Sequence, residues 1–167
     1  MAFVETWLVR EISDTVVKPS GFNIYRQDRT DDSGKHRGGG VCVMVNFLWA
    51  TDIAVLASFC SPVLELLTVK IRPFYLPRES TAVIMSVVYI PPQADKATAL
   101  DELYGIINGL ENVHPEAAFI VVGDFNRANM KKVLPKYHQH IDFFTRGDQT
   151  LDHCYTTFQS ISAPLLL

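Results

Sequence analysis

The 167-residue chain has few cysteines and little net charge. Its three cysteines, Cys42, Cys60 and Cys154, cannot all pair and lack the spacing of metal ligands. We therefore expect reduced thiols in an intracellular protein, nuclear or cytoplasmic. The N-terminus has no basic segment, and Glu5 interrupts its short apolar start, so we do not expect secretion. A net charge of −3 means that any nucleic-acid-binding surface must be local.

The sequence also lacks a continuous apolar run of membrane-spanning character. Residues 38–64 carry one formal charge, Asp52, but glycines, Ser61 and Pro62 interrupt them. Their β-branched content favours paired strands, so we predict core rather than a membrane span. With 48% hydrophobic and 20% charged residues, the chain is expected to form a single globular domain over residues 1–167.

The first half of the chain predicts loops and then antiparallel strands. Residues 20–40 contain repeated turn signals and are expected to form a loop, with the glycines at 38–40 as a flexible entry into the next strand. Apolar and β-branched runs predict strands over 41–46, 53–59 and 64–73. The short connections suggest that these strands are antiparallel neighbours.

A strand–helix–strand unit follows. Residues 81–90 predict a strand, residues 95–113 an amphipathic helix capped by its first residue, and residues 117–122 a second strand. A crossover of this kind makes the two strands parallel, so both end at the same edge of the sheet. The pattern therefore places Tyr89 close to Asp124.

The most informative stretch is the end of the second of these strands. Four apolar residues are followed by Gly123, Asp124, Phe125 and Asn126. Positions two apart in an extended chain project to the same side, so Asp124 and Asn126 would converge at the mouth of a buried strand. A carboxylate there can take a proton from water, and an amide can hold a phosphate oxygen. The alternative is an ordinary turn, which these residue types also favour.

Other polar residues are ambiguous when taken singly. Glu5 suits Mg²⁺ if it lies near Asp124, but an acid in such a segment is more commonly exposed to solvent. Tyr89 can donate a hydrogen bond to a phosphate, or it can be a core residue with a hydrated hydroxyl. The segment after Asn126 is basic without an acid, and begins with Arg127, Lys131 and Lys132. It predicts phosphate contact, against the alternative of a solvated charged face.

Four motifs in order resemble the endonuclease/exonuclease/phosphatase superfamily, the deoxyribonuclease-I-like fold. They are Glu5-Thr6-Trp7-Leu8, Val88-Tyr89-Ile90-Pro91-Pro92, Gly123-Asp124-Phe125-Asn126 and Thr150-Leu151-Asp152. The sequence around them is most similar to the endonuclease domain of non-LTR (LINE-type) retrotransposons. The similar segments include Arg37-Gly38-Gly39-Gly40 and the residues 72–79 and 114–119. The resemblance extends to about Phe158.

This resemblance implies an α/β fold, a two-sheet β-sandwich flanked by helices in four layers. It implies Mg²⁺-dependent hydrolysis of phosphodiester bonds in DNA, with Mn²⁺ as a possible substitute. A reverse transcriptase is expected downstream in a full-length element, and no membrane is involved. Glu5 matches the metal-binding glutamate, and Tyr89 and Asn126 match residues that contact the phosphate. Asp124 matches the aspartate that activates water, and Asp152 the acid that orients a catalytic histidine.

The chain departs from the family pattern at both ends. The family has a strand with an asparagine before the glutamate motif, and a final strand with Ser-Asp-His. We expect this chain to be incomplete, lacking the first and last strands and weakened in activity. His153 is not a substitute, because in a strand it would face away from Asp152. The alternatives are a phosphatase or lipid phosphodiesterase of the same fold, and a non-catalytic remnant.

Overall fold

The computed structural model describes residues 1–35, 37–76 and 78–159. Pro77, within one of the family-like segments, and residues 160–167, for which the sequence suggests no function, lie outside the described residues. The strands are β1 (Ala2–Val4), β2 (Phe22–Gln27), β3 (Val41–Asn46), β4 (Ala50–Cys60), β5 (Glu65–Pro73), β6 (Val83–Tyr89), β7 (Ala118–Asp124), β8 (His138–Gln139) and β9 (Asp152–Thr156). The helices are α1 (Asp14–Val17) and α2 (Lys96–Val113), with short 3₁₀ turns η1 (Asp31–Ser33) and η2 (Met130–Lys132).

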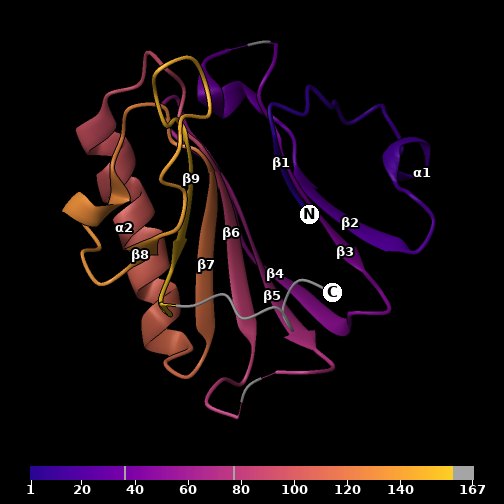
Figure 1. The fold of residues 1–167 in the computed structure, drawn as a ribbon. Coiled ribbons are helices and arrows are strands. Elements are labelled where there is room, and N and C mark those ends of the chain that lie inside the picture. Colours follow the sequence, from indigo (N-terminus) through magenta and orange to yellow (C-terminus); the bar gives the residue numbers. More distant parts are fainter. Residues whose placement is uncertain (36, 77, 160–167) are drawn as a thin grey trace.

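The strands form two sheets packed face to face. The smaller sheet has the order β1-β3-β2 and the larger one β4-β5-β6-β7-β9-β8. Helix α2 covers the outer face of the larger sheet, and α1 lies beyond the smaller sheet (Figure 1). This is the two-sheet sandwich with flanking helices that the sequence predicts.

Two apolar layers hold the sandwich together. Leu100, Leu103 and Ile107 of α2 pack on one face of the larger sheet, against residues such as Val88 and Val121. The opposite face packs against the smaller sheet through a second cluster, which includes Val43, Leu67 and Val87. Because β5, β6 and β7 are covered on both faces, they are nearly continuous in apolar residues, as the sequence shows.

The crossover unit is confirmed. Strands β6 and β7 pair in parallel, and Tyr89 stands opposite Asp124 in the ladder. Asp95 caps α2, since its side chain accepts a hydrogen bond from the backbone N–H of Thr98 at 2.8 Å. A carboxylate in this position satisfies one of the free N–H groups at the start of a helix. The predicted pairing of the strands over 53–59 and 64–73 is also confirmed.

Two predictions for the first half were wrong. Residues 20–40 are not all loop, because β2 pairs with β3 along its whole length. Phe22, Ile24 and Tyr25 favour a strand, but the flanking turn signals obscured this short run. In addition, β3 and β4 are not neighbours in one sheet, since the tight connection between them crosses from the smaller sheet to the larger one. Within the described residues, no helix is long and apolar enough to cross a membrane.

Candidate active site

A row of polar side chains crosses four adjacent strands of the larger sheet at one rim. Glu65 of β5 stands opposite Tyr89 of β6, Tyr89 opposite Asp124 of β7, and Asp124 opposite Asp152 of β9. Side chains directly opposite each other in a ladder lie on the same face of the sheet. Tyr89 belongs to the apolar cluster between the two sheets, so the row faces the smaller sheet. The rim thus gathers three carboxylates and a phenol.

Backbone geometry at the end of β7 fixes Asp124. Gly123 approaches β6 so closely that an added Cβ atom would lie 1.9 Å from the carbonyl oxygen of Val88. Asn126 has a φ of 50°, and its backbone N–H donates to Asp124 Oδ1 at 2.8 Å. The side-chain amide of Asn126 donates to the carbonyl oxygen of Ile90 at 2.6 Å. The stretch is therefore both a strand ending in a turn and the place where an acid and an amide converge.

Glu5 reaches the row from the smaller sheet. It follows β1, and the indole N–H of Trp7 donates to its Oε2 at 2.7 Å. The hydroxyl of Tyr89 donates a second hydrogen bond to Glu5. Partial burial tends to raise the pKa of Glu5, but these hydrogen bonds and the charge of Arg29 outweigh it and hold the pKa below its usual value. Burial and the Glu5 carboxylate raise the pKa of Tyr89, so its hydroxyl stays protonated at neutral pH.

Asp124 is 4% exposed and lies among other charges. Burial raises its pKa, and the carboxylates of Asp152 and Glu5 add to this effect. The hydrogen bond from Asn126 and the charge of Arg146 act in the opposite direction. Arg146 Nη2 lies 3.9 Å from Asp124 Oδ2, but this side chain is 67% exposed, so the pair is weak. A carboxylate with a raised pKa at a cleft rim is suited to accept a proton.

Asp152 and His153 lie on opposite faces of β9. Asp152 faces Asp124, and its backbone N–H donates to Thr145 Oγ1 at 3.1 Å. His153 stacks on Phe125 with ring centroids 5.2 Å apart and forms a hydrogen bond of 2.7 Å with the hydroxyl of Tyr155. Burial lowers the pKa of His153. The imidazole therefore belongs to the core under α2, as strand alternation predicts.

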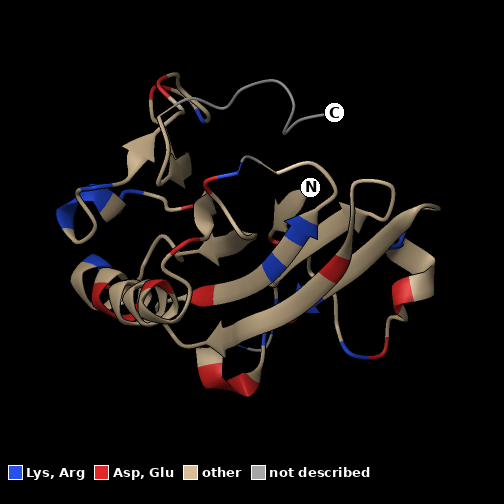
Figure 2. Ribbon diagram, turned by 90° about the horizontal axis from the view of Figure 1, so that it is seen from below, with Lys and Arg blue, Asp and Glu red and all other residues tan. Residues whose placement is uncertain are grey.

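The basic residues after Asn126 lie outside the polar row: η2 packs on the α2 side of the larger sheet, where Met130 joins the cluster under α2. Arg127, Lys131 and Lys132 are all exposed, and the two lysines belong to η2, the basic turn at the left edge of Figure 2. Arg127 Nε donates to Gln149 of the loop before β9 at 3.3 Å. Lys136 is engaged elsewhere, with its Nζ 2.8 Å from Glu111 of α2. Arg127, Lys131 and Lys132 thus remain accessible to a polyanion.

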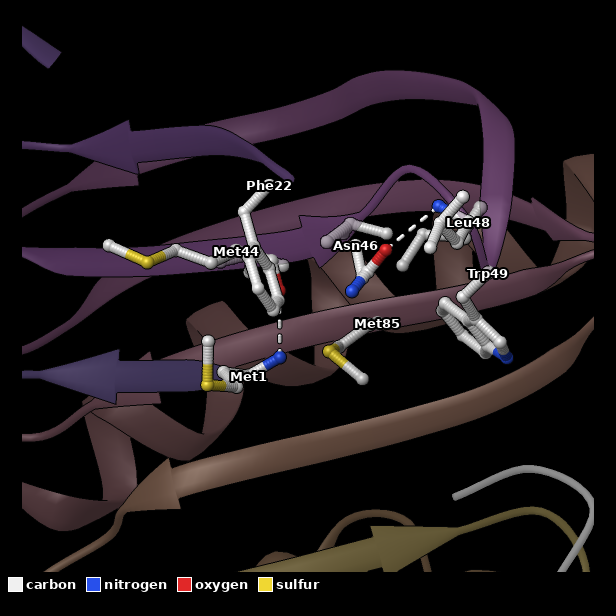
Figure 3. A pocket seen from close by; sticks show the side chains of 10 residues that line it. Met1, Phe22, Met44, Asn46, Leu48, Trp49 and Met85 are labelled. Carbon is white, nitrogen blue, oxygen red and sulfur yellow. Dashed lines mark hydrogen bonds between the residues drawn. The ribbon is translucent and has the colours of Figure 1, made fainter. Parts of the chain in front are cut away.

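The apolar cavity in Figure 3 lies away from this row. It has a volume of about 590 Å³ and is lined by residues that include Met1, Met44, Trp49 and Met85. Its one charged group near the opening, the Met1 ammonium, donates to the carbonyl oxygen of Met44 at 2.7 Å. Because the residues that line it are mainly apolar, the polar rim is the candidate site.

The predicted metal ligand and acids are brought together, but they do not form a self-contained metal cage. Across residues 1–35, 37–76 and 78–159, no three His, Cys, Asp or Glu side chains are grouped closely enough to hold a metal ion. Glu5 and Asp152 act on Asp124 through their charges, and Glu5 also acts on Tyr89, as the raised pKa values of Asp124 and Tyr89 show.

Three residues of the site escaped the sequence analysis. Glu65 completes the polar row, and Arg29 forms an ion pair with it at 2.6 Å. Arg146 approaches Asp124 from the loop before β9. The signal for Glu65 was available, because an acid that opens a strand of buried apolar residues needs a partner. Nothing in the sequence indicated which of the basic residues was that partner.

Comparison with known proteins gives a result for the fold alone. The sequence matches no known protein family and no curated protein. The structure is similar to the human Nocturnin catalytic domain with bound sulfate anion, with a TM-score of 0.62 and 11% identity over 93% of this chain and 68% of that chain. It is also similar to a truncated TDP2 from Caenorhabditis elegans, with a TM-score of 0.53 and 11% identity over 93% and 69% of the two chains. The chain therefore has the deoxyribonuclease-I-like fold of endonuclease/exonuclease/phosphatase proteins.

Proposed function

We propose that the chain is a metal-dependent phosphodiesterase that hydrolyses DNA. The observation that carries this proposal is the row of Tyr89, Asp124 and Asp152 on adjacent strands, with Glu5 hydrogen-bonded to the phenol from the other sheet. The row combines a proton acceptor, a protonated donor and several oxygen ligands at one rim. Hydrolysis of a phosphate ester requires these three kinds of group.

The residues at the rim fit a magnesium ion. Mg²⁺ is typically held by one or two carboxylates, with water and substrate phosphates as the other ligands, so a closed cage of three acids is not required. Glu5 would supply such a carboxylate, with Asp124 beside it as the proton acceptor. Their repulsion, which contributes to the raised pKa of Asp124, is the kind of strain that a cation relieves. When bound, the ion would offset negative charge that builds up on the phosphate oxygens.

The side chains of this chain would then divide the remaining work. Asp124 accepts a proton from the attacking water, since its carboxylate is buried and its pKa is raised. Tyr89 donates its hydroxyl hydrogen to a phosphate oxygen. One N–H of the Asn126 amide is held by the carbonyl oxygen of Ile90, which orients the second N–H for a phosphate oxygen. The charge of Asp152 helps to raise the pKa of Asp124, which makes Asp124 a stronger proton acceptor.

The choice of DNA as substrate is supported by charge. Arg127, Lys131 and Lys132 are exposed and closely follow Asp124 and Asn126 in the chain, although the whole chain is acidic. A polyanionic backbone is attracted by such a local patch, whereas a small phosphate monoester needs only the rim itself. The sulfate in the Nocturnin catalytic domain, a tetrahedral anion like phosphate, is consistent with anion binding by this fold.

The test is nicking of supercoiled plasmid in the presence of Mg²⁺. We expect weak nicking by the wild-type chain that is abolished by a chelator and by Asp124→Ala. A matched variant, Asp148→Ala, removes an exposed acid from the neighbouring loop and should leave nicking unchanged. Release of phosphate from inositol phosphates without nicking would indicate a phosphatase or lipid phosphodiesterase instead of a DNA-cleaving enzyme. Binding of DNA without any hydrolysis would indicate a non-catalytic remnant.

We further propose that the chain derives from a LINE-type retrotransposon endonuclease. The order and wording of the four motifs support this origin. The test is the genomic sequence downstream of the coding region, where we expect a reverse transcriptase in the same reading frame. An unrelated downstream region at every genomic copy would contradict this origin, while leaving the phosphodiesterase proposal unaffected.

A further inference from the structure

A buried ion pair lies directly behind the polar rim. Glu65, which opens β5, is 1% exposed, and the side chain of Arg29, which follows β2, is 8% exposed. Arg29 Nε and Glu65 Oε1 are 2.6 Å apart. Because β2 and β5 belong to different sheets, the pair joins the two sheets at the rim. Charged side chains are rarely buried to this extent, so the pair needs an explanation.

The guanidinium of Arg29 also contacts the phenol of the site. Its Cζ atom lies 5.8 Å from the centroid of the Tyr89 ring. Nη1 donates to the carbonyl oxygen of Arg37 at 2.8 Å, whereas Nη2 is buried and has no hydrogen-bond partner among the described residues. Gly39 packs against the same group, since a Cβ atom added there would lie 2.3 Å from Cζ. The guanidinium is therefore held by Glu65 and by backbone, with the Tyr89 ring beside it.

The other oxygen of Glu65 holds the segment that carries Glu5. Glu65 Oε2 accepts the backbone N–H of Gly40 at 2.6 Å. The carbonyl oxygens of Gly39 and Gly40 in turn accept the backbone N–H groups of Trp7 and Thr6, at 2.9 and 3.2 Å. The glycines at 38–40 are thus a packed support for the Glu5 segment, and not the flexible entry that the sequence predicts.

The backbone of the supported segment is strained. Glu5 and Trp7 have φ values of 54° and 55°, which residues other than glycine rarely adopt. Such conformations persist only where surrounding contacts enforce them, and they concentrate at functional sites. The hydrogen bonds from Thr6 and Trp7 to the glycines are those contacts. Their own position depends on Glu65, which is held by Arg29.

We propose that Arg29 is a positioning residue, which together with Glu65 fixes the Tyr89 ring and the Glu5 segment so that both face Asp124. A buried ion pair gives little net stability compared with apolar residues of the same size, and here one guanidinium nitrogen has no partner in the part of the chain that the structure describes. The position that the pair imposes on its neighbours at the rim explains why two charges are buried there despite their desolvation cost. The catalytic part of this inference rests on the proposed function, whereas the placement of the Glu5 segment does not.

Two variants test the role of Arg29. The double variant Arg29→Met with Glu65→Gln removes both charges together, which avoids leaving one charge buried alone, and keeps an acceptor for Gly40. Arg29→Lys keeps the charge but loses the planar group. The matched control is Arg26→Gln, since Arg26 is a largely buried arginine of β2 that pairs with Asp14 at 3.2 Å instead of the rim.

Two readouts are used on each variant. The first is the separation of kcat from KM in plasmid nicking. The second is the indole N–H resonance of Trp7 by NMR, without metal or DNA at pH 7, because this N–H donates to Glu5. The chain has two tryptophans, and Trp49→Phe assigns the signals. The Trp49 resonance then reports whether each variant keeps the packing at the apolar cavity, which is remote from the rim.

We expect the double variant to lose about 10²-fold in kcat with KM within about twofold, since misplacement of a reacting group by about 1 Å costs this much. The Trp7 resonance should move while that of Trp49 stays. Arg29→Lys should retain part of kcat, and Arg26→Gln should match the wild type. Unchanged kcat and an unchanged Trp7 resonance in a folded variant would overturn the proposal. If the double variant fails to fold, an unchanged kcat and an unchanged Trp7 resonance in Arg29→Lys would overturn the proposal.

The two proposals can fail separately. If the wild-type chain hydrolyses no phosphodiester, the proposed function fails. The Trp7 resonance still decides whether Arg29 positions the Glu5 segment, because it is recorded without substrate. A shift in the double variant supports that placement, and the absence of a shift overturns it.

Discussion

Replacement of Asp124 by asparagine is expected to make the protein more stable and inactive. Asparagine has the same shape as aspartate, and its Oδ1 can still accept the N–H of Asn126, a hydrogen bond of 2.8 Å. The substitution therefore removes a negative charge and little else. At the rim, that charge is buried and lies among the carboxylates of Asp152 and Glu5.

The sign of the stability change follows from the pKa. Burial and the neighbouring acids raise the pKa of Asp124 above its model-peptide value of 3.8 in the folded state. An acid whose pKa is raised on folding contributes fully to the free energy of unfolding below pH 3.8. This contribution is lost as the pH rises through the folded-state pKa. At pH 7 the ionised group thus costs stability. Asparagine removes that cost, for a gain on the order of 1 kcal/mol, typical of relieved active-site strain.

The gain in stability and the loss of nicking activity are measured on the same sample. In a chain of this size, about 1 kcal/mol raises Tm by about 2–4 °C, which differential scanning calorimetry resolves. Loss of the proton acceptor should lower the nicking rate by about 10²–10⁴-fold. The control Asp148→Asn removes one negative charge from an exposed residue and should alter neither Tm nor the nicking rate. A lower Tm for Asp124→Asn, or a nicking rate within twofold of the wild type, would refute the assignment of Asp124 as a buried base.

Three further outcomes are expected. Because the pKa of Asp124 is raised, kcat/KM should rise with pH and reach half its plateau above pH 3.8, as a pH–rate profile will show; a midpoint at or below 3.8 contradicts this. Lys131→Gln with Lys132→Gln should lower the slope of log Kd for DNA against log salt by about 2 in fluorescence anisotropy, and an unchanged slope would exclude these lysines from the interface. Gly123→Ala should cost at least about 1–3 kcal/mol in urea unfolding, because its Cβ would lie 1.9 Å from a carbonyl oxygen of β6. Gly105→Ala in α2, where the added Cβ meets no atom within 4 Å, should instead stabilise by about 1 kcal/mol, and equal effects would refute the steric argument.

Much of the rim could be predicted from local patterns. The period of the apolar residues changes from 2 to 3.6 and back, which identified the strand–helix–strand crossover. In such a crossover the two strands are parallel and end at the same edge of the sheet. That rule alone placed Tyr89 beside Asp124, as the register confirms. Alternation along β9 likewise placed His153 on the face opposite Asp152.

Other features depended on contacts between segments far apart in the chain. The strand formers Phe22, Ile24 and Tyr25 of β2 lie among turn signals, and pairing with β3 makes this short run a strand. A short connection between β3 and β4 looks the same in sequence whether the chain turns back within one sheet or crosses to the other. Only the packing of the two apolar faces against each other decided between these.

The sequence by itself determined that Tyr89 and Asp124 share one edge of the larger sheet, because crossover geometry fixes which strand ends meet. The tertiary structure alone decided how Glu5 meets Tyr89, and that Arg29 and Glu65 support both. These contacts join two sheets, and the free energy that selects them comes from burial and charge pairing between distant residues. No local spacing in the sequence encodes such a pairing.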